Sequence, residues 1–415
     1  MGVARRESAA AGPGSRALIV DLIRSSGPIS RVELVNATGL TQPTISNIVR
    51  RLIDDGVVRE TGDTVATRGK PRSMLVINSR AAYGVGIHVG ADTLTCVVTD
   101  TRGGTVGRQL VAGPADGRPE SMAAHLAALY HDITRGLGLP PQSVAGMAVV
   151  GPGPVDVARG RFLALPEAPP DPQRRAAGLD LAHALTGRLG VPVLVDSDAA
   201  AAAVGEFWGR QVSRERTFGC LYMNSGIGSG VVLDGALHRG ASSNAGKLGH
   251  IAVVRDGERC RCGNRGCLEQ YAAPRVLVAR ARATGGLADR LGIRPDDPDA
   301  RAFDVLARAA LYGDEAARAL VDESAALLAE AALALANLWD IDTLVLAGPG
   351  FAVAGSIYVT EIRRRLAERA FAREVHDVRV DLSSNPRDSA AIGGAALVLQ
   401  ASVAPGHGPD VAARV

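Results

Sequence analysis

The feature that most restricts the fold of this chain is a recurring unit, in which a short apolar run ends in a glycine-rich turn. The run Val144–Val150 ends in Gly151-Pro152-Gly153-Pro154, and Phe218–Met223 leads into a loop with glycines at 226, 228 and 230. Apolar runs of this length, separated by helical segments, indicate an α/β architecture. We expect two lobes, each opening with a glycine-bearing hairpin. The expected strands are 84–90, 94–100, 144–150, 191–195, 218–223, 231–233 and 343–346, and a closing helix is expected over 391–401.

Helical periodicity, by contrast, dominates the start of the chain. A first helix is expected over 16–26, and Ser30 with Glu33 has the spacing of a capping box that opens a second helix. That helix should stop near Gly39, and a third is expected over 42–54. Two helices joined by a short glycine turn, the second of them polar on its outer side, are typical of a helix-turn-helix.

The segment after the third helix predicts a β-hairpin wing. A strand starts near Gly56, and a basic loop at 68–72 precedes a second strand over 73–78. We therefore predict a winged helix-turn-helix over 16–80, called the head below; a helical bundle used for dimerisation is the alternative. Gln and Asn can read adenine edges, and Arg can read guanine or hold phosphate. The predicted DNA contacts are Thr41, Gln42, Thr44, Ser46, Asn47, Arg50, Arg51, Arg68, Lys70 and Arg72.

The charge distribution also separates the head from the rest. Twelve basic and seven acidic residues lie in the first 82 positions, whereas the whole chain carries a net charge of only +3. A basic head on a nearly neutral body predicts a polyanionic partner for the head alone. Lysine occurs only at positions 70 and 247. Residues 1–15 are expected to be a disordered arm, and 403–415 a flexible tail.

The cysteines predict a metal site. His250, Cys260, Cys262 and Cys267 are spaced by 10, 2 and 5 positions. Three thiolates and one imidazole match a closed tetrahedral zinc site, and four protein ligands leave no place for a reactive water, so the zinc would be structural. Unpaired thiols in a surface loop are the alternative. Cys96 and Cys220 lie among Val and Leu in expected strands and are expected to be core thiols.

Membrane insertion and secretion are not expected. The longest apolar stretch, 325–339, contains Glu330 and Asn337 and is shorter than the roughly 20 residues that a spanning helix needs. The start of the chain lacks the apolar segment of a secretory signal. We therefore expect a cytoplasmic protein with no membrane contact.

In this order, the motifs resemble those of the ROK family (repressors, open reading frames and sugar kinases), and more narrowly its transcriptional-repressor branch. They are the winged head, Gly151-Pro-Gly-Pro-Val-Asp156, the Asp198-Ala-Ala segment, Asn244-Ala-Gly-Lys-Leu-Gly-His250 and Cys260-Arg-Cys-Gly-Asn-Arg-Gly-Cys267-Leu-Glu269. The similarity runs from about residue 16 to about residue 402. It implies a two-lobed, actin-like ATPase (RNase H-like) domain over 81–402, called the body below, with a zinc knuckle at 250–267. It also implies a homodimer or tetramer.

The resemblance further implies a sugar pocket, here an effector site. Two family positions differ in this chain, where Ala200 replaces an asparagine and Lys247 replaces a glutamate. Lys247 has two interpretations: an ion pair with Glu269 or Asp198 that partly closes the pocket, or recognition of an effector that bears an acidic or phosphate group. The implied effector contacts are Gly153, Asp198, Lys247, His250 and Glu269.

The phosphate loop departs from the family's kinases. Those have a segment resembling Asp-Ile-Gly-Gly-Thr-Lys, whereas this chain has His88, Ala91 and Asp92 at the positions of the acid, a glycine and the hydroxyl. Asp92 is an acceptor-only anion that would face phosphate. Asp198 aligns with the family's general base, although an N-cap of the following helix is an equal interpretation.

We therefore predict a DNA-binding regulator of carbohydrate genes, a repressor without enzymatic activity, which binds a double-stranded operator and a small carbohydrate. An ATP-dependent sugar kinase with an appended head is the alternative. A constitutive DNA-binding protein with a vestigial pocket is a third.

Overall fold

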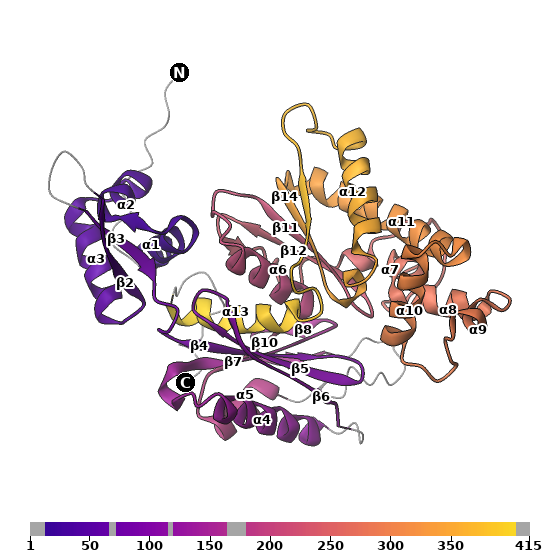
Figure 1. Cartoon of the computed structure of the whole chain (residues 1–415), viewed down its shortest axis with the longest axis horizontal. Helices are drawn as coiled ribbons and strands as arrows, with labels where there is room; N and C mark the ends of the chain where they lie inside the picture. Colours follow the sequence, from indigo (N-terminus) through magenta and orange to yellow (C-terminus); the bar gives the residue numbers. More distant parts are fainter. Residues whose placement is uncertain (1–12, 66–71, 115–118, 164–179, 404–415) are drawn as a thin grey trace.

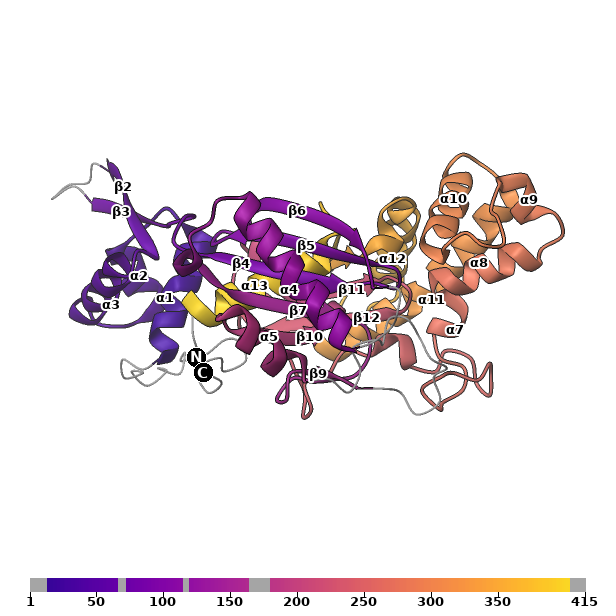
Figure 2. The ribbon, with the colours of Figure 1, turned by 90° about the horizontal axis from the view of Figure 1, so that it is seen from below.

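The computed structural model describes residues 13–65, 72–114, 119–163 and 180–403. The head lies at one end of an elongated molecule, and the two lobes of the body extend away from it (Figure 1, Figure 2). The expected wing tip with Arg68 and Lys70 lies outside the described residues. No helix in the described part of the chain has the length and apolarity needed to cross a bilayer.

The head has the expected order of elements. They are α1 (Pro13–Ser26), β1 (Ile29–Ser30), α2 (Arg31–Thr38), α3 (Gln42–Asp54), β2 (Val58–Val65) and β3 (Arg72–Ile77), and the strands form a sheet of order β1-β3-β2. The capping box is present: Ser30 Oγ accepts from the N–H of Glu33, and Glu33 Oε2 accepts from the N–H of Ser30 at 2.8 Å. Gly39 ends α2 with a φ of 68°, which a residue with a side chain adopts only at a cost. Helix α1 begins at Pro13, inside the segment expected to be a disordered arm.

The body consists of two lobes with the same strand order. The first lobe contains β4 (Tyr83–Val89), β5 (Thr93–Asp100), β6 (Thr105–Ala112), β7 (Val144–Gly151) and β10 (Val193–Ser197), and the small hairpin β8 (Val155–Asp156) and β9 (Arg161–Phe162) follows β7. The second lobe contains β11 (Phe218–Met223), β12 (Ile227–Leu233), β13 (Ala236–Leu237), β14 (Thr343–Ala347) and β15 (Arg379–Leu382). The sheet orders are β10-β7-β4-β5-β6 and β13-β12-β11-β14-β15. In each sheet a hairpin of antiparallel strands adds to one side of the first strand and parallel strands to the other, which is the expected repeat.

Two helices lie between the sheets. Helix α6 (Asp198–Gly209) packs on β11 and β12 of the second lobe, and α13 (Ser389–Val403) packs on β4 and β7 of the first. They pack against each other so closely that a Cβ on Gly205 would come within 2.7 Å of the Cα of Gly393. The apolar core around these helices is continuous with that of the head.

The remaining helices cover the outer faces (Figure 1). Helices α4 and α5 lie against the first sheet, α11 and α12 lie against the second, and α7 to α10 extend the second lobe away from the head. Their bounds are α4 (Pro119–Gly136), α5 (Leu181–Leu189), α7 (Glu269–Ala272), α8 (Pro274–Ala283), α9 (Leu287–Leu291), α10 (Asp299–Leu311), α11 (Glu315–Trp339) and α12 (Gly355–Arg369).

Candidate functional site

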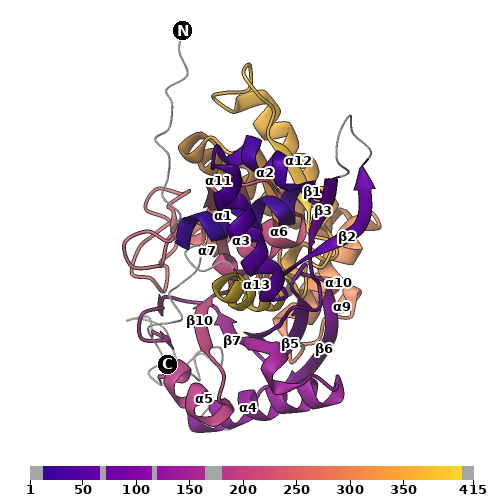
Figure 3. The ribbon, with the colours of Figure 1, turned by 90° about the vertical axis from the view of Figure 1, so that its left-hand side faces the viewer.

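The first candidate site is the outer face of α3, which Figure 3 views from the end of the molecule that carries the head. Ile45, Val49 and Leu52 are fully buried and fix the helix to the head, so the opposite side faces solvent. Thr41 caps the helix, because its side chain accepts from the N–H of Thr44. The exposed predicted contacts are Thr41, Gln42, Asn47, Arg50, Arg51 and Arg72, whereas Thr44 and Ser46 are half-buried.

The second candidate site is the cluster of His250, Cys260, Cys262 and Cys267. Their ligand atoms all lie within 4.8 Å of one another. Cys262 Sγ is 3.7 Å from Cys267 Sγ, and His250 Nδ1 is 3.5 Å from Cys260 Sγ. A tetrahedron with Zn–S arms of about 2.3 Å has edges of roughly 3.8 Å, so the four side chains fit around one metal ion of this kind.

The thiols of the cluster differ in their pKa values. Burial opposes ionisation of Cys260, but hydrogen bonds from Cys262 and Gln270 outweigh it and lower the pKa of this thiol. Burial and the neighbouring thiols raise the pKa of Cys267 to about 12. A cation would displace that proton, since thiolates are the metal-binding form. Cys96 and Cys220 lie apart from the cluster, fully buried as expected, and burial raises the pKa of each thiol.

The third candidate site begins at the first residue of α6. Ser197 is the N-cap, because its Oγ accepts from the N–H of Ala200 at 3.3 Å, so the N-cap interpretation of Asp198 is wrong. Asp198 Oδ1 accepts from the N–H of Ala199, and Oδ2 lies 3.8 Å from Nε2 of His88. His88 Nε2 is buried and has no hydrogen-bond partner among the described residues. The Asp198 carboxylate therefore has an oxygen left for a ligand.

Lys247 lies beside Asp198 and forms no ion pair within the described parts of the chain. Its Nζ donates to the carbonyl of Gly153 at 3.2 Å, and the first of its two interpretations, an ion pair with Glu269 or Asp198, is not seen. Burial lowers the pKa of Lys247, and the carboxylates of Asp198 and Asp196 oppose that shift. The ammonium thus joins the loop after β7 to the loop before His250, and its other N–H groups have no partner among the described residues.

Glu269 is occupied by two arginines that the sequence analysis did not single out. Arg261 Nη2 lies 3.1 Å and Arg275 Nη2 3.4 Å from its Oε1. Its Oε2 accepts from the N–H of Ile227 at 3.3 Å. Arg261 sits between Cys260 and Cys262, so the metal cluster and the pocket carboxylate are linked through one residue.

The structure brings the predicted effector residues together around this point. Burial lowers the pKa of Lys247 and the nearby Asp198 opposes that shift; burial also lowers the pKa of His250, which Glu269 raises and Lys247 lowers further. Because Nδ1 of His250 faces the sulfurs, Nε2 is the ring nitrogen left for a ligand. The predicted contacts of this group are Gly153, Asp198, Lys247, His250 and Glu269.

A cavity of about 520 Å³ adjoins this group; its lining includes none of the five residues, but it includes His88, which lies beside Asp198, and Arg261 and Arg275, which pair with Glu269. It runs along the loop with Asp92 towards α10. Two ion pairs lie on its walls: Arg108 with Asp388 at 2.8 Å, and Arg387 with Asp304 at 2.6 Å.

Two family models match the chain. A ROK family model matches residues 84–401, and a winged helix-turn-helix DNA-binding model matches residues 17–59. A putative xylose repressor of Caldicellulosiruptor sp. (strain Rt8B.4) is 26% identical over 387 residues, which cover 93% of this chain and 95% of that protein.

Solved structures give the same picture. A ROK family transcriptional regulator, a homolog of the E. coli MLC protein, has a TM-score of 0.72 and 25% identity, and the match covers 95% of this chain and 97% of that one. A ROK family glucokinase from Streptomyces griseus, in complex with glucose and AMPPNP, has a TM-score of 0.64 and 27% identity, and the match covers 76% of this chain and 99% of that one.

Proposed function

Because this chain belongs to the ROK family and carries a winged helix-turn-helix before its sugar-kinase-like body, we propose that it is a transcriptional repressor controlled by a carbohydrate. The expected fold, function class and lack of enzymatic activity are confirmed by its relatives, which are named as repressors and regulators over nearly the full length of the chain. We further propose the class of sugar, the residues that bind it and the metal.

The exposed polar face of α3 is the main observation that supports DNA binding by the head. Asn47 and Arg50 lie on the side opposite the buried Val49, where side chains can enter a major groove. Arg72 begins the second wing strand, from which it can reach phosphate. A head of this kind acts in pairs on half-sites about one helical turn apart, so we propose a homodimer or tetramer on a palindromic operator.

A selection of bound sequences from a random DNA pool, with the full chain, tests this function. We expect an enriched palindrome, and we expect enrichment to weaken when the ligand of the pocket is added. Asn47→Ala should reduce the discrimination between bases, by about 1–3 kcal/mol at one position in each half-site. Retention of no sequence above background would contradict the proposal.

The effector pocket is the group of Gly153, Asp198, Lys247, His250 and Glu269. A xylose repressor and a glucokinase with bound glucose are among the similar proteins, which supports a monosaccharide-sized ligand. Asp198 can accept from a hydroxyl, and the free Nζ donors of Lys247 suit an acidic substituent. We propose a uronate or a sugar phosphate as the effector.

The metal at His250, Cys260, Cys262 and Cys267 is proposed to be a structural zinc ion. The donor set and the S–S and S–N separations support it. Zinc bound there would fix His250 and hold Arg261 against Glu269. It would supply no chemistry, because four protein ligands fill its coordination sphere.

Kinase activity, the alternative, is disfavoured by the phosphate loop. His88 stands where the family's kinases have an acid, and Asp92 is exposed on the wall of the cavity. Two carboxylates at the far wall already pair with Arg108 and Arg387. A triphosphate in this cavity would meet the Asp92 carboxylate, for which the described residues provide no ion pair.

A further inference from the structure

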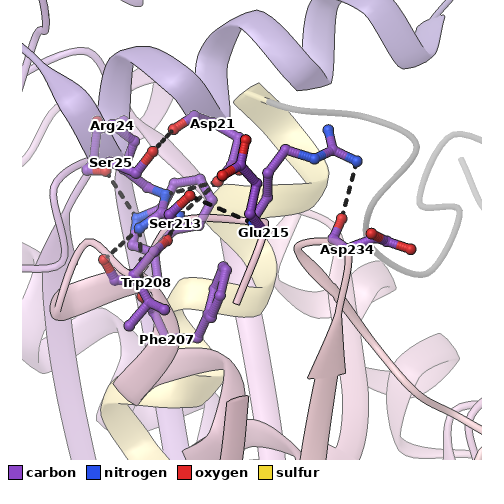
Figure 4. Close-up of polar contacts among 11 residues, drawn as sticks. Asp21, Arg24, Ser25, Phe207, Trp208, Ser213, Glu215 and Asp234 are labelled. Carbon is purple, nitrogen blue, oxygen red and sulfur yellow. Dashed lines mark hydrogen bonds and ion pairs between the residues drawn. The ribbon is translucent and has the colours of Figure 1, made fainter. Parts of the chain in front are cut away.

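One side chain of the head, that of Arg24, is buried against the body (Figure 4). Arg24, in the last turn of α1, is 1% exposed. Its guanidinium donates to the carbonyls of Phe207, Trp208 and Val212 at 3.4, 3.1 and 2.8 Å. It also lies over the rings of Phe207 and Trp208, 5.0 and 4.9 Å from their centroids.

The position of this contact on the body is specific. Phe207 and Trp208 are in the last turn of α6, where carbonyl groups carry partial negative charge and a cation is stabilised. Asp21, 8% exposed, accepts two hydrogen bonds from Arg24 at 2.6 and 3.1 Å, so the buried guanidinium is both neutralised and multiply bonded. Lysine could not make this set of planar contacts.

The same turn of α6 holds the linker between head and body. Trp208 Nε1 donates to the carbonyl of Thr101 at 3.1 Å. The hydroxyl of Thr101 donates to the carbonyl of Ala82, and its N–H donates to that of Ser79. The segment 79–82, which joins β3 to β4, is thus tied to the end of α6 that holds Arg24.

The opposite end of α6 lies in the effector group. Asp198 is its first residue, and the helix of 12 residues is about 18 Å long. A Cβ on Gly228 or Gly230 of β12 would come within 2.7 Å of Ala199 or 2.5 Å of Ala203, so the helix lies directly on the strand. With α13 packed against its other side, α6 has no room to bend and must move as a unit.

Strand β12 also connects the effector group to the Asp21–Arg24 pair. Its first residue, Ile227, donates to Glu269 of the effector group. Beyond its other end, a Cβ on Gly235 would lie 3.5 Å from Asp21 Oδ2, which has no hydrogen-bond partner among the described residues. Both elements therefore start at the pocket and end at the Asp21–Arg24 pair.

We propose that Arg24 is the joint that couples the effector pocket to the operator-binding head. This inference rests on the proposed function and assigns its route of regulation. A ligand that draws Asp198 or Glu269 towards it displaces α6 and β12 together. Because the far ends of these elements contact Arg24 and the linker, the displacement changes the position of the head and therefore of α3. Linkage requires the coupling to be reciprocal, so operator DNA shifts the affinity for the sugar by the same factor.

The test compares wild type with Arg24→Met/Asp21→Asn, which removes both buried charges and keeps the volume. The matched control is Arg16→Gln, because Arg16 lies on the same helix but pairs with Asp55 inside the head. Operator affinity is measured by fluorescence anisotropy with and without D-glucuronate, D-xylose or glucose 6-phosphate, whichever raises the melting temperature of wild type. Sugar affinity is measured by calorimetry with and without operator.

Wild type and the control should show the same coupling, in the usual range of about 5–150-fold, and the double variant should bind each ligand with a coupling factor near 1. Wild-type coupling in the folded double variant would overturn the inference and leave the proposed function intact. Wild type that ignores both DNA and sugar would overturn the proposed function itself.

A measurement without ligand tests the inference even if the double variant binds DNA or sugar poorly. Hydrogen exchange of residues 79–82 should accelerate in the double variant and to a smaller extent in Arg24→Lys, which keeps the charge pair but not the full set of carbonyl contacts. Exchange in Arg16→Gln should equal that of wild type. Unchanged protection of the linker from hydrogen exchange in both Arg24 variants would overturn the inference.

Discussion

At the scale of single residues, Lys247 is proposed to determine which ligand the pocket prefers. The residue is half-buried, and its Nζ is bonded to one carbonyl and unpaired with any described carboxylate. Lys247→Met should weaken binding of D-glucuronate by about 1.5–3 kcal/mol, the value of a charge-assisted hydrogen bond, and leave a neutral sugar nearly unaffected. Titration calorimetry checks this, and tight binding of a neutral sugar that survives Lys247→Glu would contradict it.

The same lysine makes binding depend on pH. Burial lowers its pKa, and Asp198 and Asp196 only partly restore it. The ammonium therefore loses its proton at a lower pH than an exposed lysine does, and the attraction for an anionic effector goes with it. Calorimetry from pH 7 to the onset of alkaline unfolding should show falling affinity for glucuronate in wild type but a flat profile in Lys247→Met. Equal profiles would assign the change to another group.

At the scale of elements, the capping box of α2 makes the stability of the head sensitive to acid. Hydrogen bonds from the Ser30 hydroxyl and then its N–H lower the pKa of Glu33; burial opposes the shift, and Arg72 adds a smaller contribution that lowers the pKa further. A depressed folded-state pKa stabilises the protein above the unfolded pKa and loses that contribution as pH falls through the folded one.

Urea unfolding of Glu33→Gln should therefore show a deficit at pH 7 that shrinks as the pH falls below about 4, near the ordinary glutamate pKa. Ser30→Ala should cost about 0.5–2 kcal/mol, as is usual for a lost N-cap. A deficit for Glu33→Gln that is constant across this pH range would mean that the carboxylate charge does not contribute.

The metal loop is a second element with a separable effect. Removing the proposed zinc ion with a chelator, or substituting Cys262→Ser, should release Arg261 and His250 from the wall of the pocket. We expect a lower melting temperature and weaker sugar binding, with operator selectivity of α3 retained. Metal content by atomic emission, with Cys96→Ser as the control thiol, checks the assignment; a full complement of zinc in Cys262→Ser would contradict it.

The short-range features of these elements were predictable from sequence, and the long-range ones were not. Ser30 and Glu33 are three residues apart, so their capping box could be predicted from local spacing. The N-cap of α6 does not follow from spacing alone, because Asp196, Ser197 and Asp198 are all capable of capping, and in the structure Ser197 is the cap. Arg275 reaches Glu269 through the fold of α7 and α8, which no spacing rule describes.

At the scale of the whole molecule, the two lobes keep the shape of a kinase without its phosphate loop. We expect no ATP turnover with a panel of sugars, against the roughly 1–100 s⁻¹ of ordinary kinases. A coupled assay with wild type checks this. Turnover near 1 s⁻¹ that is lost in Asp198→Asn would identify the protein as an enzyme instead.

The two-lobed order and the division into head and body were also predictable, because the glycine hairpins repeat and the charge changes along the chain. The docking of the head was not. Arg24 and Trp208 are far apart in sequence, and an arginine in a helical last turn ordinarily indicates a solvated end. Its burial depends on aromatic rings supplied by another domain, which one helix cannot reveal.

The contact between α6 and β12 has a consequence for how this protein can vary through descent. Ala199 and Ala203 are one helical turn apart, about 6 Å, and Gly228 and Gly230 are two strand residues apart, about 6.8 Å, so methyl groups meet bare backbone in register. Neither partner can grow, and the glycines cannot shrink to compensate. Inherited substitutions should therefore be confined to other positions, and these four should stay small in any descendant that still responds to its ligand.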